Sequence, residues 1–343
     1  MTDFEKKIKS CIKRDEISGQ QSCLFNYCMV KIIRNHISIY IPNGNEIPDN
    51  VNLGNNNNIS FNYNNVAPKN IIFLKGIWVM LRKYVPYNAG HVLGDEVFSI
   101  WQTLHIFDIQ EKCKEINIIT DNKGPHLKQY ECLTKKIPQQ LSNFQGIFCF
   151  ETLICGTDRQ RYAVQGPRST CLPEFRTTFD SFRKHTYDIF DIIPEKKKSI
   201  VFLDKCAEVS EHKCKLYEID MLVDDVSVKY PSYNVKKISW KDMEMRNQVN
   251  VMESAEIVIT LPGSDMMNCV FLRPGSTIIC VCRFCENNRM EYSNEFGLWF
   301  NNSDHNAVYF DNVEKIKEKN QLYSKIKEKN QLYNIIDEII KNK

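Results

Sequence analysis

The sequence predicts an α/β protein made of two doubly wound halves that face each other across a cleft, followed by a C-terminal helical tail. Short apolar runs of about five residues alternate with helical patterns in both halves, as parallel βαβ units require. The run Pro194-Glu-Lys-Lys-Lys198 marks a boundary, because proline ends a helix and a charge run favours solvent. A chain of 343 residues can hold two domains. We therefore expect domains at 1–193 and 194–310 and a helical tail at 311–343.

The composition is that of a globular protein with nearly balanced charge. Hydrophobic residues make up 43% of the chain and charged residues 25%, and the net charge is +3. This balance gives no reason to expect a nucleic-acid partner or an anionic membrane. The N-terminus is charged and no apolar run reaches about 18 residues, so we expect no signal peptide, no transmembrane segment and a cytoplasmic protein. Abundant Asn, Lys and Ile are typical of AT-rich genomes, as in protists and large DNA viruses.

The first half should begin with an edge region and continue with βα units. Apolar runs bounded by turn residues predict strands, and Asn55-Asn-Asn-Asn58 predicts an exposed loop. A helix of roughly Leu127 to Leu141 should be interrupted at Pro138. The expected strands are 23–28, 36–42, 71–81, 116–120 and 146–150.

Two features follow the last of these strands. The segment Gly156 to Arg168 has no apolar period and contains three arginines, Arg159, Arg161 and Arg168. It predicts a loop at the end of a strand, which is either a ligand-binding loop or a solvated basic loop. The aromatic residues that come next have helical spacing and predict a core-facing stripe: Phe175, Phe179, Phe182 and Phe190.

The second half repeats the alternation and predicts a second doubly wound unit. We expect strands at 199–204, 235–239, 256–260 and 277–281, and helices at 213–223, at 242–254 and from Asp265. The nine residues Lys315 to Tyr323 recur unchanged at Lys325 to Tyr333. Two such short copies cannot build a solenoid, so they predict a duplication within a helix that has a packing or interaction role.

The stretch from Tyr87 to Leu104 is the one around which the chain is organised. A helix beginning near Gly90 would place Leu93, Val97, Ile100, Trp101 and Leu104 on one packed stripe. His91, Asp95, Phe98 and Gln102 would lie on the opposite face, free for chemistry. His91 and Asp95 are four residues apart and would project together near the helix start, either as a functional pair or as solvated surface residues.

A second candidate site is the turn Leu261-Pro262-Gly263-Ser264-Asp265. It follows an apolar strand and opens a helix, so backbone N–H groups and the helix dipole could face a diphosphate, which Gly263 would allow to approach closely. Ser264 and Asn268 could add side-chain hydrogen bonds. Asp265 has two possible roles, as a helix cap or as part of the ligand site.

Two motifs together resemble glycosyltransferase family 61. Asn88, His91 and Asp95 form the pattern Asn-x-x-His-x-x-x-Asp. About 160 residues later, Gln248 to Gly275 is similar to the donor-site segment of that family, with a Gln-led helix, an apolar strand, a glycine turn, Asn268 and Phe-Leu-x-Pro-Gly. The resemblance covers roughly residues 20–310.

The resemblance implies an inverting, metal-independent glycosyltransferase of the GT-B type, with two Rossmann-like domains. Its donor would be a nucleoside-diphosphate sugar, most simply a UDP sugar, and its acceptor a hydroxyl of a glycan or glycoprotein. No cofactor and no metal are expected, and no Asp-x-Asp occurs in the chain. Either His91 or Asp95 would be the general base. The residues implied for donor binding are Lys205, Gln248, Pro262, Gly263, Ser264, Asp265 and Asn268, and those for acceptor binding are Asn88, Arg159, Arg161 and Arg168.

The sequence departs from the family pattern at two places. The family usually has His-Gly-Ala-Gly where this chain has Pro262-Gly-Ser-Asp265, and often has Arg where Lys205 stands. Lysine neutralises phosphate but makes no bidentate contact. These departures leave a second hypothesis open, a catalytically inactive glycan-binding or scaffold protein on the same fold.

A third hypothesis is a cytosolic zinc or nucleic-acid module, based on the basic loop and the pair Cys282 and Cys285. The chain has 14 cysteines, and Cys23 and Cys28 form a further pair that could bind zinc or form a disulfide. A structural zinc site needs four ligands at recognisable spacing, however, and only one Cys-x-x-Cys is present. Most of the cysteines are better interpreted as small buried hydrophobic residues.

Overall fold

A computed structural model gives the architecture in two compact units, Met1–Ala163 and Val164–Lys343, which are described separately. The sequence placed a boundary at 193/194, 30 residues further along, and α3 (Pro173–Ile189) therefore belongs with the second unit. The roles expected for the two domains remain predictions. The structure describes residues 10–14, 21–34, 36–42, 48, 51, 59–64, 70–81, 87–121, 123–156, 173–195, 198–204, 214–261, 263–281, 305–310, 312–318 and 321–342.

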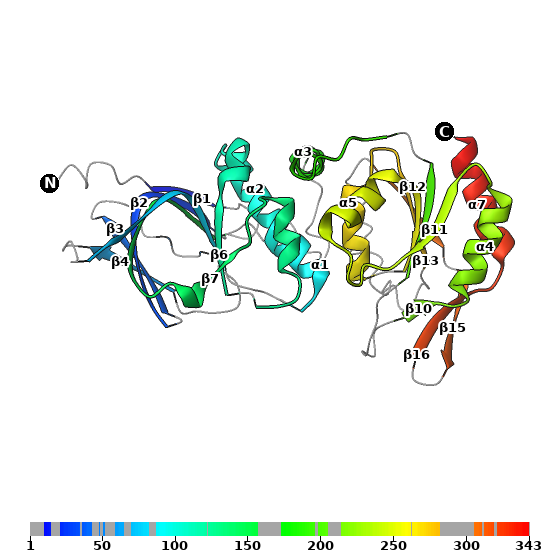
Figure 1. Cartoon of the computed structure of the whole chain (residues 1–343), viewed down its shortest axis with the longest axis horizontal. Coiled ribbons are helices and arrows are strands. Elements are labelled where there is room, and N and C mark those ends of the chain that lie inside the picture. The colour runs from blue at the N-terminus through cyan, green and yellow to red at the C-terminus, as the bar shows by residue number, and fades with distance from the viewer. Residues whose placement is uncertain are drawn as a thin grey trace. The chain divides into compact units, whose positions relative to one another are not determined.

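The first unit is built on an eight-stranded sheet with the order β4-β3-β2-β8-β5-β6-β7, in which β1 also pairs with β2. Helical segments connect its strands after β5 (Figure 1). The strands are β1 (Ser10–Arg14), β2 (Gln21–Ile33), β3 (His36–Pro42), β4 (Ile59–Asn64), β5 (Ile72–Leu81), β6 (Asn117–Thr120), β7 (Gln139–Gln140) and β8 (Gly146–Cys155). The helical segments are α1 (Ala89–His91), η1 (Val92–Phe98), α2 (Ser99–Ile106), η2 (Gln110–Glu115), η3 (Leu127–Cys132) and η4 (Leu141–Asn143).

This sheet is mixed: the parallel pairing expected for the βαβ units of the first half is present from β8 to β7, and antiparallel pairing surrounds β2. Strands β8, β5, β6 and β7 are parallel neighbours, but β2 runs antiparallel to β1, β3 and β8. The reason is local: only two residues separate β2 from β3, and a connection that short can form a hairpin but no parallel crossover. The parallel neighbours β8-β5-β6-β7 include β5, the strand that leads into α1.

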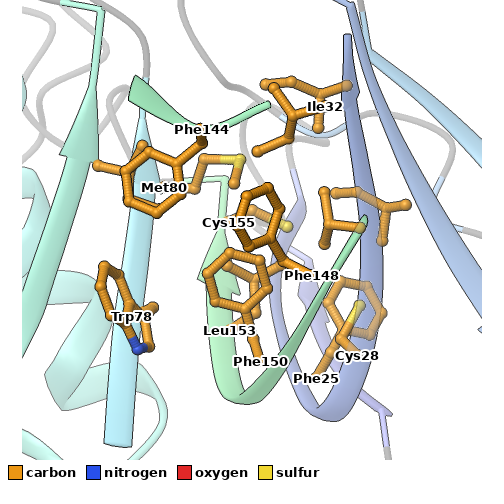
Figure 2. Packing of buried hydrophobic residues seen from close by; sticks show 14 of the residues in the cluster. Phe25, Cys28, Ile32, Trp78, Met80, Phe144, Phe148, Phe150, Leu153 and Cys155 are labelled. Atoms are coloured by element: carbon orange, nitrogen blue, oxygen red, sulfur yellow. The ribbon is translucent and has the colours of Figure 1, made fainter. Parts of the chain in front are cut away.

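The core of the first unit lies against this sheet and is rich in aromatic side chains. Figure 2 shows Trp78 and Met80 of β5 beside Phe148 and Phe150 of β8. The Trp78 ring meets the Phe150 ring edge to face, with centroids 5.8 Å apart. Such pairs contribute on the order of 1 kcal/mol beyond the area that they bury. This packing fixes the strand that precedes the candidate site.

The prediction of a helix at 127–141 was wrong. The chain forms only the short 3₁₀ turn η3 at 127–132, and it is extended again at β7, which pairs with β6. Pro138 has no N–H to continue a helix and disfavours helical conformation in the residue before it. The short turn nevertheless buries Tyr130 completely.

The second unit contains a five-stranded, all-parallel sheet with the order β11-β9-β12-β13-β14. Four of its strands, β9, β11, β12 and β13, match the sequence expectations to within about a residue, and β14 was not expected. The helix expected at 213–223 is preceded by strand β10 and begins at Ile219. Its elements are β9 (Ser199–Leu203), β10 (Cys214–Leu216), α4 (Ile219–Lys229), β11 (Asn234–Ile238), α5 (Met245–Ser254), β12 (Ala255–Thr260), η5 (Ser264–Phe271), β13 (Thr277–Val281), β14 (Asn306–Phe310), β15 (Val313–Glu318), β16 (Gln321–Ile326) and α7 (Lys329–Lys341).

Helices cover both faces of this parallel sheet. Helices α4 and α7 lie on one side of it and α5 on the other (Figure 1). Ile200 and Phe202 of β9 pack with Leu222 of α4 and Leu332 of α7 in one buried cluster. This is the layering expected of a doubly wound unit. Among the described helices, none is both long and apolar enough to cross a bilayer.

The repeated nonapeptide does not form the helix that was expected for both copies. Its first copy lies in the β15–β16 hairpin, and its second copy runs from the end of β16 into α7. Residues 321–323 and 331–333 have the same sequence, yet one is strand and the other helix. Leu332 and Ile336 are fully buried against the sheet, so tertiary packing decides the second conformation.

Candidate functional site

The first group of site residues begins at the N-terminus of α1. Asn88 is extended, with φ −114° and ψ 111°, and its side-chain oxygen accepts hydrogen bonds from the backbone N–H groups of Gly90 (2.9 Å) and His91 (3.3 Å). This is the geometry of an N-cap, which satisfies donors that a helix start leaves open. Asn88 therefore orders the turn, and a role in acceptor binding remains a prediction.

After His91 the helix changes type. As a result, the residues on its exposed face differ from those that the sequence predicted. Residues Val92–Phe98 form a π-helical segment before α2 continues. The expected packed stripe is buried, but Phe98 and Gln102, expected on the open face, are also buried, with 1% and 3% exposure. The wider π turn shifts later residues relative to a regular 100° step, and η3 packs against this segment. From Val92 to Leu104, Asp95 is the one residue that is partly exposed.

His91 and Asp95 form a close pair at the exposed start of this helix. His91 Nδ1 lies 2.6 Å from Asp95 Oδ2, and the two side chains are 37% and 11% exposed. A carboxylate that accepts from Nδ1–H fixes the ring orientation and leaves Nε2 available to take a proton. The pair predicted from the four-residue spacing is therefore present, in contact and open to solvent through the imidazole.

Three further residues at this site were missed in the sequence analysis. Glu96, next to Asp95, is 1% exposed, and the hydroxyl of the fully buried Tyr130 donates to its carboxylate. Burial lowers the pKa of His126, while a hydrogen bond between its ring and the Tyr87 backbone opposes that shift. The sequence did contain a signal for Glu96, because it lies within the apolar run after His91. A carboxylate buried there requires a hydrogen-bond partner. The partner, in η3, could not be identified from spacing.

The second group lies at the carboxyl edge of the parallel sheet in the other unit. In chain order the strands are arranged 2-1-3-4-5, so the direction of winding reverses between β9 and β12. Ligands of such sheets bind at this switch point, beyond the carboxyl ends of the strands. The turn with Gly263, Ser264 and Asp265 follows β12 there, and Gly263 has φ 143° and ψ −174°, a conformation that is largely restricted to glycine. Gly263 occupies the cap position and Asp265 lies in the first turn of η5, so Asp265 is not the N-cap.

Hydrogen bonds fix this turn from two directions. The indole N–H of Trp240, after β11, donates to the Asp265 carbonyl at 3.1 Å, which joins the loops that follow both neighbours of β9. Asn268 Nδ2 donates to Gln248 Oε1 at 2.8 Å, and Gln248 Nε2 donates to the Met243 carbonyl at 2.8 Å. Gln248 and Asn268 are each 5% exposed. Gln248 thus holds Asn268 in place, and donor contacts of either residue remain predictions.

A polar cluster at the opposite, amino edge of the sheet ties α3 to the end of η5. Arg183 donates to the Leu272 carbonyl at 2.9 Å, and the Tyr187 hydroxyl donates to the Phe271 carbonyl. Burial, with a contribution from the charge of Arg183, lowers the pKa of His305 to about 3. This cluster lies at the end of the strands away from the Gly263 turn and forms no part of the candidate site.

Several predicted residues lie outside the described parts of the chain. These are Lys205 and Pro262 on the donor side, Arg159, Arg161 and Arg168 of the basic loop, the loop at 55–58, and Cys282 and Cys285. Cys23 and Cys28 are buried free thiols, as expected for small hydrophobic residues. Among the residues that the structure describes, no three His, Cys, Asp or Glu side chains gather as a metal site would require.

The two groups define an α/β protein with a His–Asp pair at a helix start in one unit and a glycine turn at the switch point of a parallel sheet in the other. The sequence model of the family described as Glycosyltransferase 61 matches residues 90–279, more than half of the chain. The chain therefore belongs to glycosyltransferase family 61. The match includes His91, Asp95, Gln248, the Gly263 turn and Asn268, so it covers residues of both groups.

Two curated relatives carry the name protein O-linked-mannose beta-1,4-N-acetylglucosaminyltransferase 2. The protein of Tetraodon nigroviridis is 21% identical over 232 residues, and that of Takifugu rubripes is 22% identical over 242 residues. Each alignment covers 63% of this chain, and 39% and 40% of the two relatives. The chain thus spans about two fifths of the length of the curated relatives that it matches.

Proposed function

We propose that this chain is an inverting, metal-independent glycosyltransferase that transfers a sugar from a UDP donor to a hydroxyl of a glycan or glycoprotein. The observation that carries the proposal is the His91–Asp95 pair, with 2.6 Å between Nδ1 and Oδ2. It supports this function because sugar transfer requires a group that removes the proton of the acceptor hydroxyl as that oxygen attacks. Family membership supports the reaction class.

In the proposed reaction His91 is the general base and Asp95 orients it. The acceptor oxygen forms a bond to the anomeric carbon while the bond from that carbon to the diphosphate oxygen breaks. The hydroxyl proton moves to Nε2 of His91, and the bonding electrons leave with UDP. Asp95 accepts from Nδ1–H and stabilises the imidazolium that forms, as carboxylates do beside other histidine bases. One displacement on the face opposite the leaving group inverts the anomeric configuration.

The Gly263 turn is the proposed diphosphate site. The start of η5 supplies backbone N–H groups and the positive end of a helix dipole, and Gly263 carries no side chain to block a phosphate. In the sequence, Lys205 comes two residues after Leu203, the last residue of β9, and we propose that it adds a positive charge. These groups would stabilise the leaving diphosphate without a divalent ion.

The relatives suggest which donor and acceptor to test first. Their names specify transfer of N-acetylglucosamine to protein O-linked mannose. We therefore propose UDP-N-acetylglucosamine as the first donor and an O-mannosyl peptide as the first acceptor. The proposal includes the GT-B arrangement, in which the acceptor would dock on the first unit and the nucleotide sugar on the second.

The deciding experiment measures product formation from a panel of UDP sugars, with and without EDTA. Proton NMR of the product gives its anomeric configuration, which should be inverted, and EDTA should leave the rate unchanged. A retained configuration would contradict the inverting mechanism, and a rate abolished by EDTA and restored by a divalent metal would contradict metal independence.

An inactive glycan-binding protein is the second candidate, favoured by the departure of Pro262-Gly-Ser-Asp265 from the family pattern. Calorimetry with the same UDP sugars and with free oligosaccharides separates the two functions. Binding of a UDP sugar is expected for the enzyme. Binding of oligosaccharides with no heat from any UDP sugar would favour the inactive protein.

A further inference from the structure

The segment from His126 to Cys132 contacts the chain on both sides of the His91–Asp95 pair. On the N-terminal side, the His126 ring is hydrogen bonded to the backbone of Tyr87, the residue before the Asn88 cap. On the C-terminal side, the Tyr130 hydroxyl donates to the carboxylate of Glu96, the residue after Asp95. Two contacts from one short turn therefore bracket the eight residues Asn88 to Asp95.

The contact between Tyr130 and Glu96 is the stronger of the two constraints. Both residues are buried, Tyr130 with no exposure and Glu96 with 1%. A buried carboxylate is costly unless hydrogen bonds compensate it, so Glu96 has few positions that it can occupy. Neighbouring residues of a helix turn together, and rotation that moved Glu96 away from Tyr130 would also turn Asp95 away from His91.

The contact between Tyr130 and Glu96 holds the π-helical segment that also contains Asp95. Glu96 and Asp95 both lie in Val92–Phe98, where hydrogen bonds span five residues in place of four. Such segments store a less favoured backbone geometry that the surroundings must hold. Glu96 is anchored inside the unit, while Asp95 is 11% exposed and meets the imidazole. The buried Glu96 can therefore determine the direction in which the Asp95 side chain points.

We propose that Tyr130 is a positioning residue that acts through Glu96 on the His91–Asp95 pair, with His126 holding the turn at the other end. Loss of the Tyr130 hydroxyl loosens the π segment and lengthens the hydrogen bond between His91 Nδ1 and Asp95. The catalytic consequence rests on the proposed function, but the effect on the imidazole does not. This difference allows the two proposals to fail separately.

The test compares Tyr130→Phe with Tyr187→Phe as a matched control. Tyr187 is also buried and also donates its hydroxyl, to the Phe271 carbonyl in the second unit, so its loss removes a similar bond far along the chain from His91. The direct readout is ¹⁵N NMR of protein labelled at its seven histidines, with His91 assigned by His91→Gln. It reports which ring nitrogen of His91 carries the proton.

We expect Tyr130→Phe to lower the share of His91 protonated at Nδ1 by at least about twofold, since the bond to Asp95 favours that tautomer. Transfer should fall by about tenfold or more in kcat with the donor KM unchanged, because misplacement of a catalytic group slows chemistry more than donor binding. Tyr187→Phe should change neither quantity. Glu96→Gln, which keeps an acceptor for the Tyr130 hydroxyl, should retain the His91 tautomer.

Equal His91 spectra in Tyr130→Phe and Tyr187→Phe would overturn the proposal, and so would loss of the tautomer in Glu96→Gln. His126→Phe provides a second route if Tyr130→Phe does not fold, because His126 is only partly buried. It should shift the His91 spectrum in the same direction, and an unchanged spectrum would also overturn the proposal. Absence of transfer by the unmodified protein with every donor would refute the function alone, because the spectra still decide the positioning role.

Discussion

His91 Nδ1 and Asp95 Oδ2 are 2.6 Å apart, although the two residues lie in different types of helix. His91 ends the short α1 and Asp95 lies in the π segment that follows it. Spacing of four residues brings side chains together in an α-helix, and the contact survives the change of helix type. On its N-terminal side the pair is held by the Asn88 cap, whose side-chain oxygen accepts a hydrogen bond from the backbone N–H of His91.

The first prediction concerns this pair. Asp95→Asn should reduce transfer by about 10² to 10⁴-fold, because an amide no longer stabilises the imidazolium and can favour the other tautomer. Donor affinity, measured by calorimetry, should change little. The control is Asp108→Asn, since Asp108 is exposed and has φ 56°, a conformation that asparagine adopts readily. Full transfer activity in Asp95→Asn would refute the assigned site.

A second prediction concerns the glycine at the switch point. Gly263→Ala should weaken UDP-sugar binding, because φ 143° strains any other residue by about 1–3 kcal/mol and a methyl group would face the diphosphate. Gly275→Ala is a matched control: Gly275 has φ 77° and open space around a Cβ, and it precedes β13 at the other edge of the sheet. Both variants should melt at a lower temperature, but only Gly263→Ala should raise the donor Kd. Equal donor affinity in the two variants would place the diphosphate elsewhere.

The second unit could be predicted from sequence more fully than the first, for a physical reason. Parallel strands buried on both faces appear as continuous apolar runs, and the expected runs at 199–204, 256–260 and 277–281 correspond to β9, β12 and β13. The first unit mixes parallel and antiparallel pairing, and the apolar run that predicts a strand does not specify which other strand it pairs with. Its sheet order therefore required the structure.

The repeated nonapeptide shows a different limit. The three residues that end each copy are strand at 321–323 and helix at 331–333, so local propensity does not determine their conformation. The buried face supplied by β9 and α4 selects the helix around Leu332. For the candidate site, spacing predicted the His91–Asp95 contact, while Tyr130 lies 34 residues beyond Glu96 and could be found only from the fold.

A third prediction tests whether Gln248 acts through Asn268. Each change to alanine should destabilise the second unit by about 1–3 kcal/mol, because the partner amide is left buried and unpaired. The double variant should lose less than the sum, since both changes remove one interaction. In the Asn268→Ala background, Gln248→Ala should have no further effect on donor Kd. Urea unfolding and calorimetry measure these quantities.

Ser276→Ala is the control for that cycle, because Ser276 donates to the Ala255 carbonyl at 2.9 Å at the other edge of the sheet. It should cost stability and leave donor affinity unchanged. Additive effects of the two alanine changes on donor Kd would show that Gln248 contacts the donor independently of Asn268.

The last prediction concerns stability in acid and follows from His305. Burial and the nearby charge of Arg183 lower the pKa of this side chain to about 3, while in the unfolded chain it is near 6.5. The unfolded state therefore binds more protons below pH 6.5, and stability that is fully present above that pH is lost as the pH falls toward 3. Between pH 7 and pH 5 this one residue should account for about 2 kcal/mol of lost stability.

His305→Gln removes the titrating group, so the loss of unfolding free energy between pH 7 and pH 5 should shrink by about that amount, whatever the variant costs at pH 7. His36→Gln is the control, because His36 is exposed and lies in the first unit. Urea unfolding of the three proteins at both pH values measures the differences. The same acid sensitivity in His305→Gln and the unmodified protein would mean that His305 is already charged in the folded state near pH 5, and that the amino edge of the sheet is more open to water than its burial implies.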